Sequence, residues 1–583
     1  MGLAGQKGDR DNSSELLAVF EELTDSRSDP GRLNGDGSDI LYTTSRDIVS
    51  AFEGEKFKAV LHGRIDNEAS LREEFGVSEE ISRAELIVEI YREEGEKFQE
   101  ELLGSYTFVI YDLRSEKLLL GRDATGLQSL YYSVKEDLVI FSTEISALIE
   151  HEDLSCGTNR EAVASYLKGE MDRREETFYQ DIKRLPPDST LVIDEEVRLL
   201  EHCSLKDEFR GNSTESAKSL REVLEEPVKD RLEDRKKVGV LMSGGLDSTA
   251  VASIAYSFDR DVEALSMLFD RFEEADERER ISDAAEEIGL DVRKHRGDEE
   301  TPSINDELLG DLMRNGPCVN PNSRASHKSY VEASENGFDI LLSGGGGNIL
   351  DGSRLAYADM LRNGELEKFV RTARNDSLSN RQIIGWCGLA PLFPRLASLI
   401  VSEKSEVHQE LLAEEYLDRE VEDIGAEVKR LEAEQMLGSI LSPEVDIQMD
   451  IGRKLALKEG IELRYPYMDE RVLRFVAHTE TGTLFGENGH KTAFRQAFSE
   501  DLPESIIDYD GNETLEPLIR HSLCEAESDE IKSELDSSIL EKKGIVKKGA
   551  SKTLYKRYRK GEVSTSVFWR YLSTEIWLSN RFN

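Results

Sequence analysis

The stretch SGGLDS, residues 243–248, has the residue types and spacing of an anion-binding loop. Gly244 and Gly245 allow backbone amides to approach an anion closely, and the two serines add hydroxyl donors. Asp247 would repel phosphate unless a cation lay between them, and Mg²⁺ prefers carboxylate and phosphate oxygens. The loop therefore predicts a site for a phosphate group with bound Mg²⁺, in which Asp247 is the metal ligand.

The elements around this loop favour the same interpretation. Residues 236–242, KKVGVLM, predict a buried strand, and the helix expected to start near Asp247 adds its N-terminal dipole and free amides. No Gly-Lys-Ser/Thr follows, so the loop is not of the Walker A type, and it is not a GxGxxG turn either. The alternative is an ordinary strand–glycine-loop–helix turn that binds nothing.

The rest of the chain predicts two α/β domains, residues 1–205 and 214–583, joined by the polar segment 206–216. In the second domain, strands expected at 262–269 and 337–344 alternate with helices, which is typical of a parallel sheet. Residues 354–480 predict mostly helix. In the first domain, strand patterns occur at 58–65, 105–112, 117–123, 129–134 and 138–143, a helix pattern at 82–95 and a hairpin at 184–202.

The chain of 583 residues is strongly acidic, with a formal net charge of -45. This charge argues against a broad nucleic-acid surface, because phosphate binding needs a positive field. The acidic residues interleave with periodic apolar ones, which favours a halophile-type acidic surface over disorder. No apolar run is long enough to cross a bilayer and no signal peptide is evident, so we expect a cytoplasmic protein without a membrane partner.

A basic segment interrupts the acidic trend. Residues 541–560 carry nine Lys/Arg and one Glu. The segment is either a contact for an acidic partner or nucleotide, or a basic patch packed on the acidic surface of the same chain.

The loop 243–248 resembles the pyrophosphate loop of the N-type ATP pyrophosphatases. The wider stretch VGVLMSGGLDSTAVA resembles the asparagine synthetase family more closely. Further motifs of that family follow in order. They are residues 104–132 (with Arg122, Asp123, Gly126 and Tyr132), 141–148, 460–475, 490–506 and 567–582.

The resemblance implies a fold: an αββα sandwich of the Ntn-hydrolase, class II glutamine amidotransferase type, then a Rossmann-like parallel sheet that binds ATP. It also implies a reaction, in which a small-molecule or peptide carboxylate is adenylated, pyrophosphate leaves, and ammonia or another amine displaces AMP. ATP and Mg²⁺ are the implied cofactors. A homodimer is one open possibility for the assembly. The implied ATP and pyrophosphate contacts are Met242, Ser243, Gly244, Gly245, Asp247, Ser248, Met267, Ser343 and Gly344.

The first domain departs from the family at its glutaminase residues. Met1 stands where the family has its cysteine nucleophile, and a thioether cannot form a thiolate. His62 and Arg64 replace the Asn and Glu of the glutamine pocket, and Arg83 replaces an acid that meets the glutamine amine. His62 as a catalytic base is the alternative to a structural histidine. We therefore interpret this domain as a scaffold and not a glutaminase.

The second domain departs from the family too. In the glycine-rich motif at 341–352, Gly345 replaces a functional Glu and Asn348 replaces a metal-binding Asp, although Asp351 could compensate. Gly511 stands where a lysine is expected, and either Lys491 or the basic tail could replace that charge. We interpret Lys491 as part of a K-x-x-x-R helix motif and not as a catalytic residue.

Two hypotheses remain open. One is an amide-forming ligase that uses ammonia or a substrate amine, and the other is a catalytically impaired, nucleotide-binding regulatory homologue. A third, a sulfur-inserting tRNA enzyme with a similar loop, is disfavoured by the acidic surface and the lack of cysteine pairs.

Overall fold

The computed structural model divides the chain into two compact units. The first comprises Met1–Ser204 with the short segments Leu312–Gly316 and Leu441–Asp446, and the second comprises Leu205–Asp311, Pro317–Ile440 and Ile447–Asn583. The structure describes residues 3–8, 30–35, 38–43, 49–135, 138–151, 153–154, 156–171, 174–202, 219–232, 236–259, 261–302, 304, 307–374, 376, 378, 383–384, 387, 410–416, 431–487, 489–509 and 514–582. The segment 206–216, expected to be the linker, lies outside these residues.

The first unit is built on two antiparallel sheets, in the orders β10-β8-β9-β1-β3-β2 and β12-β11-β7-β6-β5-β4. The strands are β1 Leu3–Gly8, β2 Pro30–Gly35, β3 Ser38–Thr43, β4 Val49–Glu53, β5 Phe57–Ile65, β6 Gly104–Asp112, β7 Lys117–Arg122, β8 Tyr131–Lys135, β9 Leu138–Ser142, β10 Lys183–Arg184, β11 Ser189–Ile193 and β12 Val197–Glu201. Each strand predicted in this part of the sequence is present within a residue or two of its expected ends.

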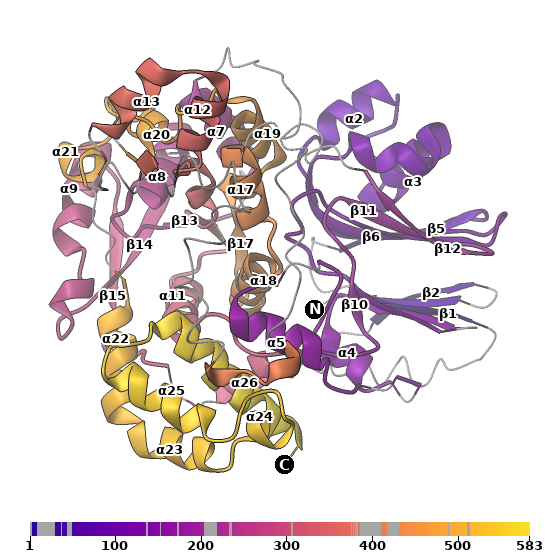
Figure 1. Cartoon of the computed structure of the whole chain (residues 1–583). Helices are drawn as coiled ribbons and strands as arrows, with labels where there is room; N and C mark the ends of the chain where they lie inside the picture. Colours follow the sequence, from indigo (N-terminus) through magenta and orange to yellow (C-terminus); the bar gives the residue numbers. More distant parts are fainter. Residues whose placement is uncertain are drawn as a thin grey trace. The chain divides into compact units, whose positions relative to one another are not determined.

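The two sheets pack face to face and carry helices on their outer sides. One core joins residues of both sheets, among them Val60 of β5 and Phe141 of β9. A second core fills the space between the other face of the β5 sheet and helix α3, Arg83–Glu94, whose residues Leu86 and Ile90 are fully buried. Figure 1 shows α2 (Glu68–Glu74) and α3 on one side of this sandwich and α4 (Ile145–Ile149) and α5 (Arg160–Lys168) on the other. The expected αββα fold is confirmed.

The second unit is built on a parallel sheet in the order β15-β14-β13-β16-β17. Its strands are β13 Val238–Leu241, β14 Glu263–Leu268, β15 Val292–Arg296, β16 Ile340–Ser343 and β17 Glu462–Arg464. The three central strands were predicted from their apolar runs. β15 and β17 were not, because one reads Val-Arg-Lys-His-Arg and the other has only three residues in a region that predicts helix.

Helices make up most of the remaining structure of the second part of the chain. They are α7 Leu220–Lys229, α8 Leu246–Phe258, α9 Arg278–Ile288, α10 Glu307–Leu312, α11 Ser323–Glu335, α12 Ala356–Asn363, α13 Leu366–Ala373, α17 Leu431–Ile440, α18 Pro443–Lys458, α19 Glu470–His478, α20 Thr492–Ala497, α21 Glu504–Ile507, α22 Glu516–His521, α23 Ser528–Asp536, α24 Ile539–Lys542, α25 Ala550–Arg559 and α26 Thr565–Phe582. The closing helix α26 buries Trp569 and Trp577, as an amphipathic helix would.

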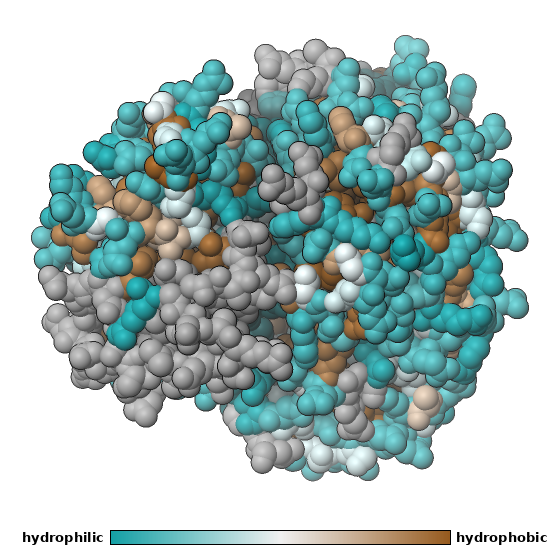
Figure 2. All heavy atoms as spheres, turned by 180° about the vertical axis from the view of Figure 1, so that it is seen from behind, coloured by the Kyte–Doolittle hydropathy of each residue, from teal (hydrophilic) through white to brown (hydrophobic). Residues whose placement is uncertain are grey.

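The basic segment 541–560 includes α25, and several of its charges meet acidic residues of the same chain. Lys552 Nζ lies 2.8 Å from Asp536 Oδ1, and Arg557 Nη1 lies 2.7 Å from Glu410 Oε2. These pairs are the kind of contact that a patch packed on its own acidic surface makes. Hydrophilic residues dominate the surface that Figure 2 shows. Among the described residues, no helix combines the length and apolar character needed to span a membrane.

Candidate functional site

A cavity of about 1050 Å³ lies in the second unit, at the carboxyl edge of its parallel sheet. The residues that directly follow β13, β14 and β16 contribute to its walls. Open α/β sheets bind ligands outside the carboxyl ends of their strands, and pockets of about 300–1000 Å³ hold small molecules. The cavity therefore has the position and the size of a nucleotide or cofactor site.

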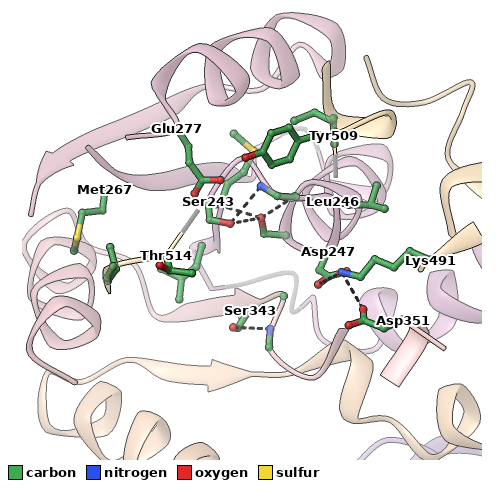
Figure 3. A pocket seen from close by; sticks show the side chains of 18 of the residues that line it. Ser243, Leu246, Asp247, Met267, Glu277, Ser343, Asp351, Lys491, Tyr509 and Thr514 are labelled. Carbon is green, nitrogen blue, oxygen red and sulfur yellow. Dashed lines mark hydrogen bonds and ion pairs between the residues drawn. The ribbon is translucent and has the colours of Figure 1, made fainter. Parts of the chain in front are cut away.

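The loop 243–248 forms one wall of this cavity and is folded tightly on itself. The Ser243 amide donates to Ser248 Oγ over 3.1 Å, and the two serine hydroxyl oxygens are 3.2 Å apart. Gly244 has φ +82°, a conformation that L side chains rarely adopt, and Gly245 is the N-cap of α8. Figure 3 shows Ser243 beside the start of this helix, and the first amides of a helix have no partner within the helix itself.

A second glycine-rich loop, residues 344–347, packs directly against the first. A Cβ atom added to Gly344 would lie 2.8 Å from the Ser248 amide nitrogen, and one added to Gly347 would lie 2.5 Å from Asp247 Cγ. Both distances are too short for a real side chain. The run of glycines after β16 therefore has a structural reason, which is the close approach of the two loops.

The two family positions that are altered in this second loop have different environments. Gly345 lines the cavity, but a Cβ atom there would lie 3.0 Å from the Tyr465 ring. Asn348 is exposed and is not among the residues that line the cavity. Asp351, in contrast, contributes to the cavity wall. Gly511 lies outside the described residues.

Asp247, Lys491 and Asp351 form a charged cluster at the cavity wall (Figure 3). Lys491 Nζ lies 2.7 Å from each carboxylate oxygen of Asp247 and 3.3 Å from Asp351 Oδ1. The Lys491 amide also donates to the Asp351 carbonyl oxygen over 3.0 Å. Lys491 has φ +60° and is the N-cap of α20, so its position depends on an uncommon backbone conformation for a residue with a side chain.

Burial controls the protonation of this cluster. It raises the pKa of Asp247 and of Asp351, and in both cases the Lys491 ammonium opposes the rise. Burial also acts to lower the pKa of Lys491, but the two carboxylates outweigh it, so the pKa of Lys491 is raised. Lys491 therefore carries its positive charge at neutral pH, and with both carboxylates ionised the cluster holds one uncompensated negative charge.

The other end of the cavity is more apolar. Its walls include Met242, which follows β13, and Met267 and Phe269, which lie at the end of β14. Helix α11 adds Ser329 and Tyr330. Ser329 Oγ lies 3.1 Å from Nε2 of the buried His295. An apolar wall with a few hydroxyl groups suits a flat heterocyclic ring.

The cavity brings together most of the residues that the sequence singled out. Those that line it are Met242, Ser243, Gly245, Asp247, Ser248, Met267, Ser343 and Gly344, while Gly244 lies in the same loop. The cavity is also lined by Lys491 and Arg354, which the sequence did not predict as site residues. The Lys-x-x-x-Arg motif at 491–495 was the available signal for Lys491, but it was assigned to a helix and not to the site.

The residues of the altered glutamine pocket lie in the first unit. Arg64 forms an ion pair with Asp66 at 2.7 Å, and Arg83 Nη1 donates to the Gly63 carbonyl oxygen over 3.2 Å. His62 is buried on β5. Met1 lies outside the described residues.

Comparison with known proteins finds matches to two family profiles. The family profile named Asparagine synthase matches residues 219–579, more than half of the chain. The chain belongs to the asparagine synthase family. A second profile, that of the glutamine amidotransferase domain, matches residues 50–202. The amidotransferase profile covers the motifs at 104–132 and 141–148, and the Asparagine synthase profile covers the loop 243–248 and the motifs at 460–475 and 490–506.

Two proteins named as asparagine synthetases match part of this chain at 26% and 30% identity. The glutamine-hydrolysing asparagine synthetase 1 of Bacillus subtilis is 26% identical over 236 residues, 39% of this chain and 37% of that protein. A putative glutamine-hydrolysing asparagine synthetase of Methanocaldococcus jannaschii is 30% identical over 325 residues, 53% of this chain and 56% of that protein. The chain thus spans less than two thirds of the length of these relatives.

Among solved structures, a glutamine phosphoribosylpyrophosphate amidotransferase from B. subtilis, complexed with ADP and GMP, has a TM-score of 0.27 and 12% identity. The match covers 59% of this chain and 90% of that chain.

Proposed function

We propose that this chain is an ATP-dependent amide-forming ligase that works through an acyl-adenylate and uses ammonia or a substrate amine in place of glutamine. The observation that carries the proposal is the charged cluster of Asp247, Lys491 and Asp351 beside the loop 243–248. A glycine-rich loop at a helix N-terminus, a cation and two carboxylates together suit a triphosphate that is cleaved between its α and β phosphates.

In the proposed reaction, a carboxylate oxygen of the acceptor attacks the α-phosphorus. The bond from that phosphorus to the bridging oxygen of the β-phosphate breaks, and pyrophosphate leaves with the electron pair. The amine nitrogen then attacks the acyl carbon, the bond from this carbon to the AMP oxygen breaks, and the amine loses a proton. Lys491 and the amides of the loop 243–248 stabilise negative charge on the phosphates during the first step.

The donor set of the cavity fits Mg²⁺. Two carboxylates, Asp247 and Asp351, contact one ammonium and are left with a net negative charge, and Mg²⁺ binds through one or two carboxylates together with phosphate oxygens. These two residues would hold the ion. When bound, it neutralises charge on the departing pyrophosphate. Asn348 is exposed outside the cavity wall and is not part of this set.

The choice of ammonia or an amine rests on the first unit. The cysteine nucleophile of the family is replaced by Met1, and cationic Arg64 and Arg83 stand at altered positions of the glutamine pocket. Arg64 forms an ion pair with Asp66, and Arg83 donates a hydrogen bond to the Gly63 carbonyl oxygen. Both side chains are therefore held by contacts within the first unit. Arg83, at the position of the family's acid, carries the charge that would repel the α-ammonium group of glutamine.

The second candidate is a nucleotide-binding regulatory homologue that does not catalyse the reaction. It is favoured by Gly345 and Asn348, which replace a functional Glu and a metal-binding Asp. The two candidates differ in one measurable property: both bind Mg·ATP, but only the ligase releases AMP and pyrophosphate.

The test uses the full chain at high salt. We expect Mg·ATP binding by calorimetry, at least about 10-fold weaker binding for Asp247→Asn, and unchanged binding for Asp259→Asn, a half-buried carboxylate at the C-cap of the same helix that does not line the cavity. Release of AMP and pyrophosphate is then measured with aspartate or cell-extract metabolites plus ammonia. Absence of Mg·ATP binding would overturn both candidates, and binding without release would favour the regulatory one. Steady formation of glutamate from glutamine would refute the assignment of the first unit.

A further inference from the structure

A second cavity, of about 460 Å³, opens at one edge of the sandwich in the first unit. Its walls include residues of β8 and β10 from one sheet and of β11 and β12 from the other, and β10 and β12 are edge strands. β7 and β6 separate β11 from β5, which carries His62 and Arg64 of the altered glutamine pocket, and neither residue lines the cavity. The cavity is therefore distinct from that pocket, and its volume is typical of small-molecule sites.

The inner part of this cavity is apolar. Leu191 of β11 lines it and belongs to the core between the two sheets, and Leu199 of β12 lines it and packs against that core. At the mouth, Val134 is 39% exposed and Val197 is 46% exposed, and they are two of the six large apolar side chains that are exposed in the described part of the chain. Exposed apolar side chains that gather at one place mark binding sites more often than scattered ones do. The cavity thus offers burial to an apolar group.

A buried hydroxyl group belongs to the same wall. Tyr132 lines the cavity and is 4% exposed, and its hydroxyl makes no hydrogen bond within the described part of the chain. Burial raises the pKa of Tyr132, and the carboxylate of Glu175, which also lines the cavity, adds to the rise, so the hydroxyl keeps its proton. A buried hydroxyl without a hydrogen bond is costly, so a polar group of a ligand that accepts from it gains stability.

The rim of the cavity carries charges of both signs. Lys135 Nζ lies 2.7 Å from Asp181 Oδ2, and Lys183 Nζ lies 3.1 Å from Glu175 Oε2. All four side chains are partly exposed. Ion pairs exposed to water contribute little to stability, so these charges can turn to the charged groups of a ligand at small cost. The rim has two cations and two anions, although the chain as a whole has a net charge of -45.

The edge strand β10 leaves part of β8 without a neighbour. β10 is two residues long and pairs with Tyr131 and Tyr132 alone, so in the described part of the chain no strand lies beside Ser133–Lys135 on that side. Successive residues of an antiparallel strand direct their backbone N–H and C=O groups to alternate edges. One of the two cavity residues Ser133 and Val134 therefore presents a donor and an acceptor on this side.

We propose that this cavity binds a free α-amino acid with an apolar side chain, in its zwitterionic form. The side chain of the ligand enters toward Leu191, its ammonium group meets the rim carboxylates, and its carboxylate meets the rim lysines and the Tyr132 hydroxyl. A zwitterion has one charge of each sign and no net charge, so the acidic chain does not repel it as it repels a free anion. The site lies within the first unit and does not depend on the proposed reaction.

The test begins with calorimetry on the full chain. The ligands are leucine, methionine and phenylalanine, each compared with its primary amide and with the carboxylic acid that lacks its amino group. We expect at least one of the three amino acids to bind with a Kd below about 1 mM. Its amide and its deaminated acid should bind at least about 10-fold more weakly, because each has lost one charge-assisted contact. Serine should not bind measurably, because it has no apolar side chain to bury.

Matched variants test the cavity itself. Val197→Trp fills the mouth and should abolish binding, whereas Val370→Trp, at an exposed valine of α13, should leave it unchanged. Tyr132→Phe removes only the hydroxyl and should weaken binding about 10-fold. Lys183→Met should weaken it as well, and Lys458→Met, at an exposed lysine that does not line the cavity, should not. The two smaller changes keep the test decisive if the added tryptophan prevents folding.

Hydrogen exchange locates the bound amino acid. We expect the tightest ligand to slow amide exchange in residues 129–135 and 175–183 and to leave 58–65 unchanged. The inference is refuted if none of the three amino acids binds with a Kd below about 1 mM, or if the amide binds as tightly as the amino acid. Unchanged affinity in Val197→Trp, or in both Tyr132→Phe and Lys183→Met, also refutes it. Protection confined to residues 58–65 would place the ligand in the altered glutamine pocket and would overturn the assignment.

Discussion

Lys491 Nζ lies 2.7 Å from both carboxylate oxygens of Asp247, although the two residues are 244 positions apart in the chain. Asp247 is presented by the first turn of α8, and Lys491 by the N-cap of α20. The contact therefore joins two distant segments at the one place where the loop 243–248 would hold phosphate. It places a positive charge between Asp247 and Asp351, each of which loses hydration on burial.

Replacement of this lysine tests the cluster. We expect Lys491→Met to lower ATP-dependent pyrophosphate release at least about 100-fold, because it removes a cation placed where negative charge develops. It should also lower the free energy of unfolding by about 2 kcal/mol, since two partly buried carboxylates are left without their partner. Pyrophosphate assay and denaturant unfolding measure the two effects. Lys458→Met, at an exposed lysine paired with Asp311, is the matched control and should change neither. Unaltered pyrophosphate release in Lys491→Met would contradict the assigned role.

The close approach of the two glycine loops gives a second prediction. In Gly347→Ala the new Cβ would lie 2.5 Å from Asp247 Cγ, so the carboxylate has to move away from Lys491. We expect about 10-fold weaker Mg·ATP binding by calorimetry together with a lower melting temperature. Gly438→Ala places a methyl group on α17 where nothing lies within 4 Å, and it should leave binding unchanged. Normal Mg·ATP affinity in Gly347→Ala would show that Asp247 does not need its present position.

A buried histidine beside the cavity predicts a dependence of stability on pH. Burial lowers the pKa of His295 to about 4, although the Glu332 carboxylate acts in the opposite direction. In the unfolded chain the His295 imidazole binds a proton near pH 6.5, while in the folded chain it does so only near pH 4. The contribution of neutral His295 to the free energy of unfolding is therefore complete above pH 6.5 and is lost progressively as the pH falls toward 4.

The measurement compares the melting temperature at pH 7.5 and 5.0. We expect a larger fall for the unaltered chain than for His295→Gln, which cannot titrate and keeps a polar group near Ser329. The slope from one such group is at most about 1.4 kcal/mol per pH unit. Equal falls in both proteins would mean that His295 does not contribute to the acid sensitivity.

The sequence by itself determined those features that depend on local pattern. Alternating and continuous apolar runs predicted the strands of the sandwich and the three central parallel strands, because side-chain period and burial are properties of short segments. The loop 243–248 predicted an anion site because its glycines, its carboxylate and the start of α8 are neighbours in the chain. β15 escaped prediction because its charged sequence carries no such pattern.

Only the tertiary structure decided which distant groups meet at that loop. It directed Asn348 to the exterior and brought Asp351 and Lys491 to the cavity wall. It also fixed Arg354 on Asp376. These outcomes depend on how α20, the turn at Gly352 and the loop 344–347 pack, and such packing is set by contacts between residues far apart in the chain. A motif specifies which chemical groups are available, and their mutual distances follow from the fold.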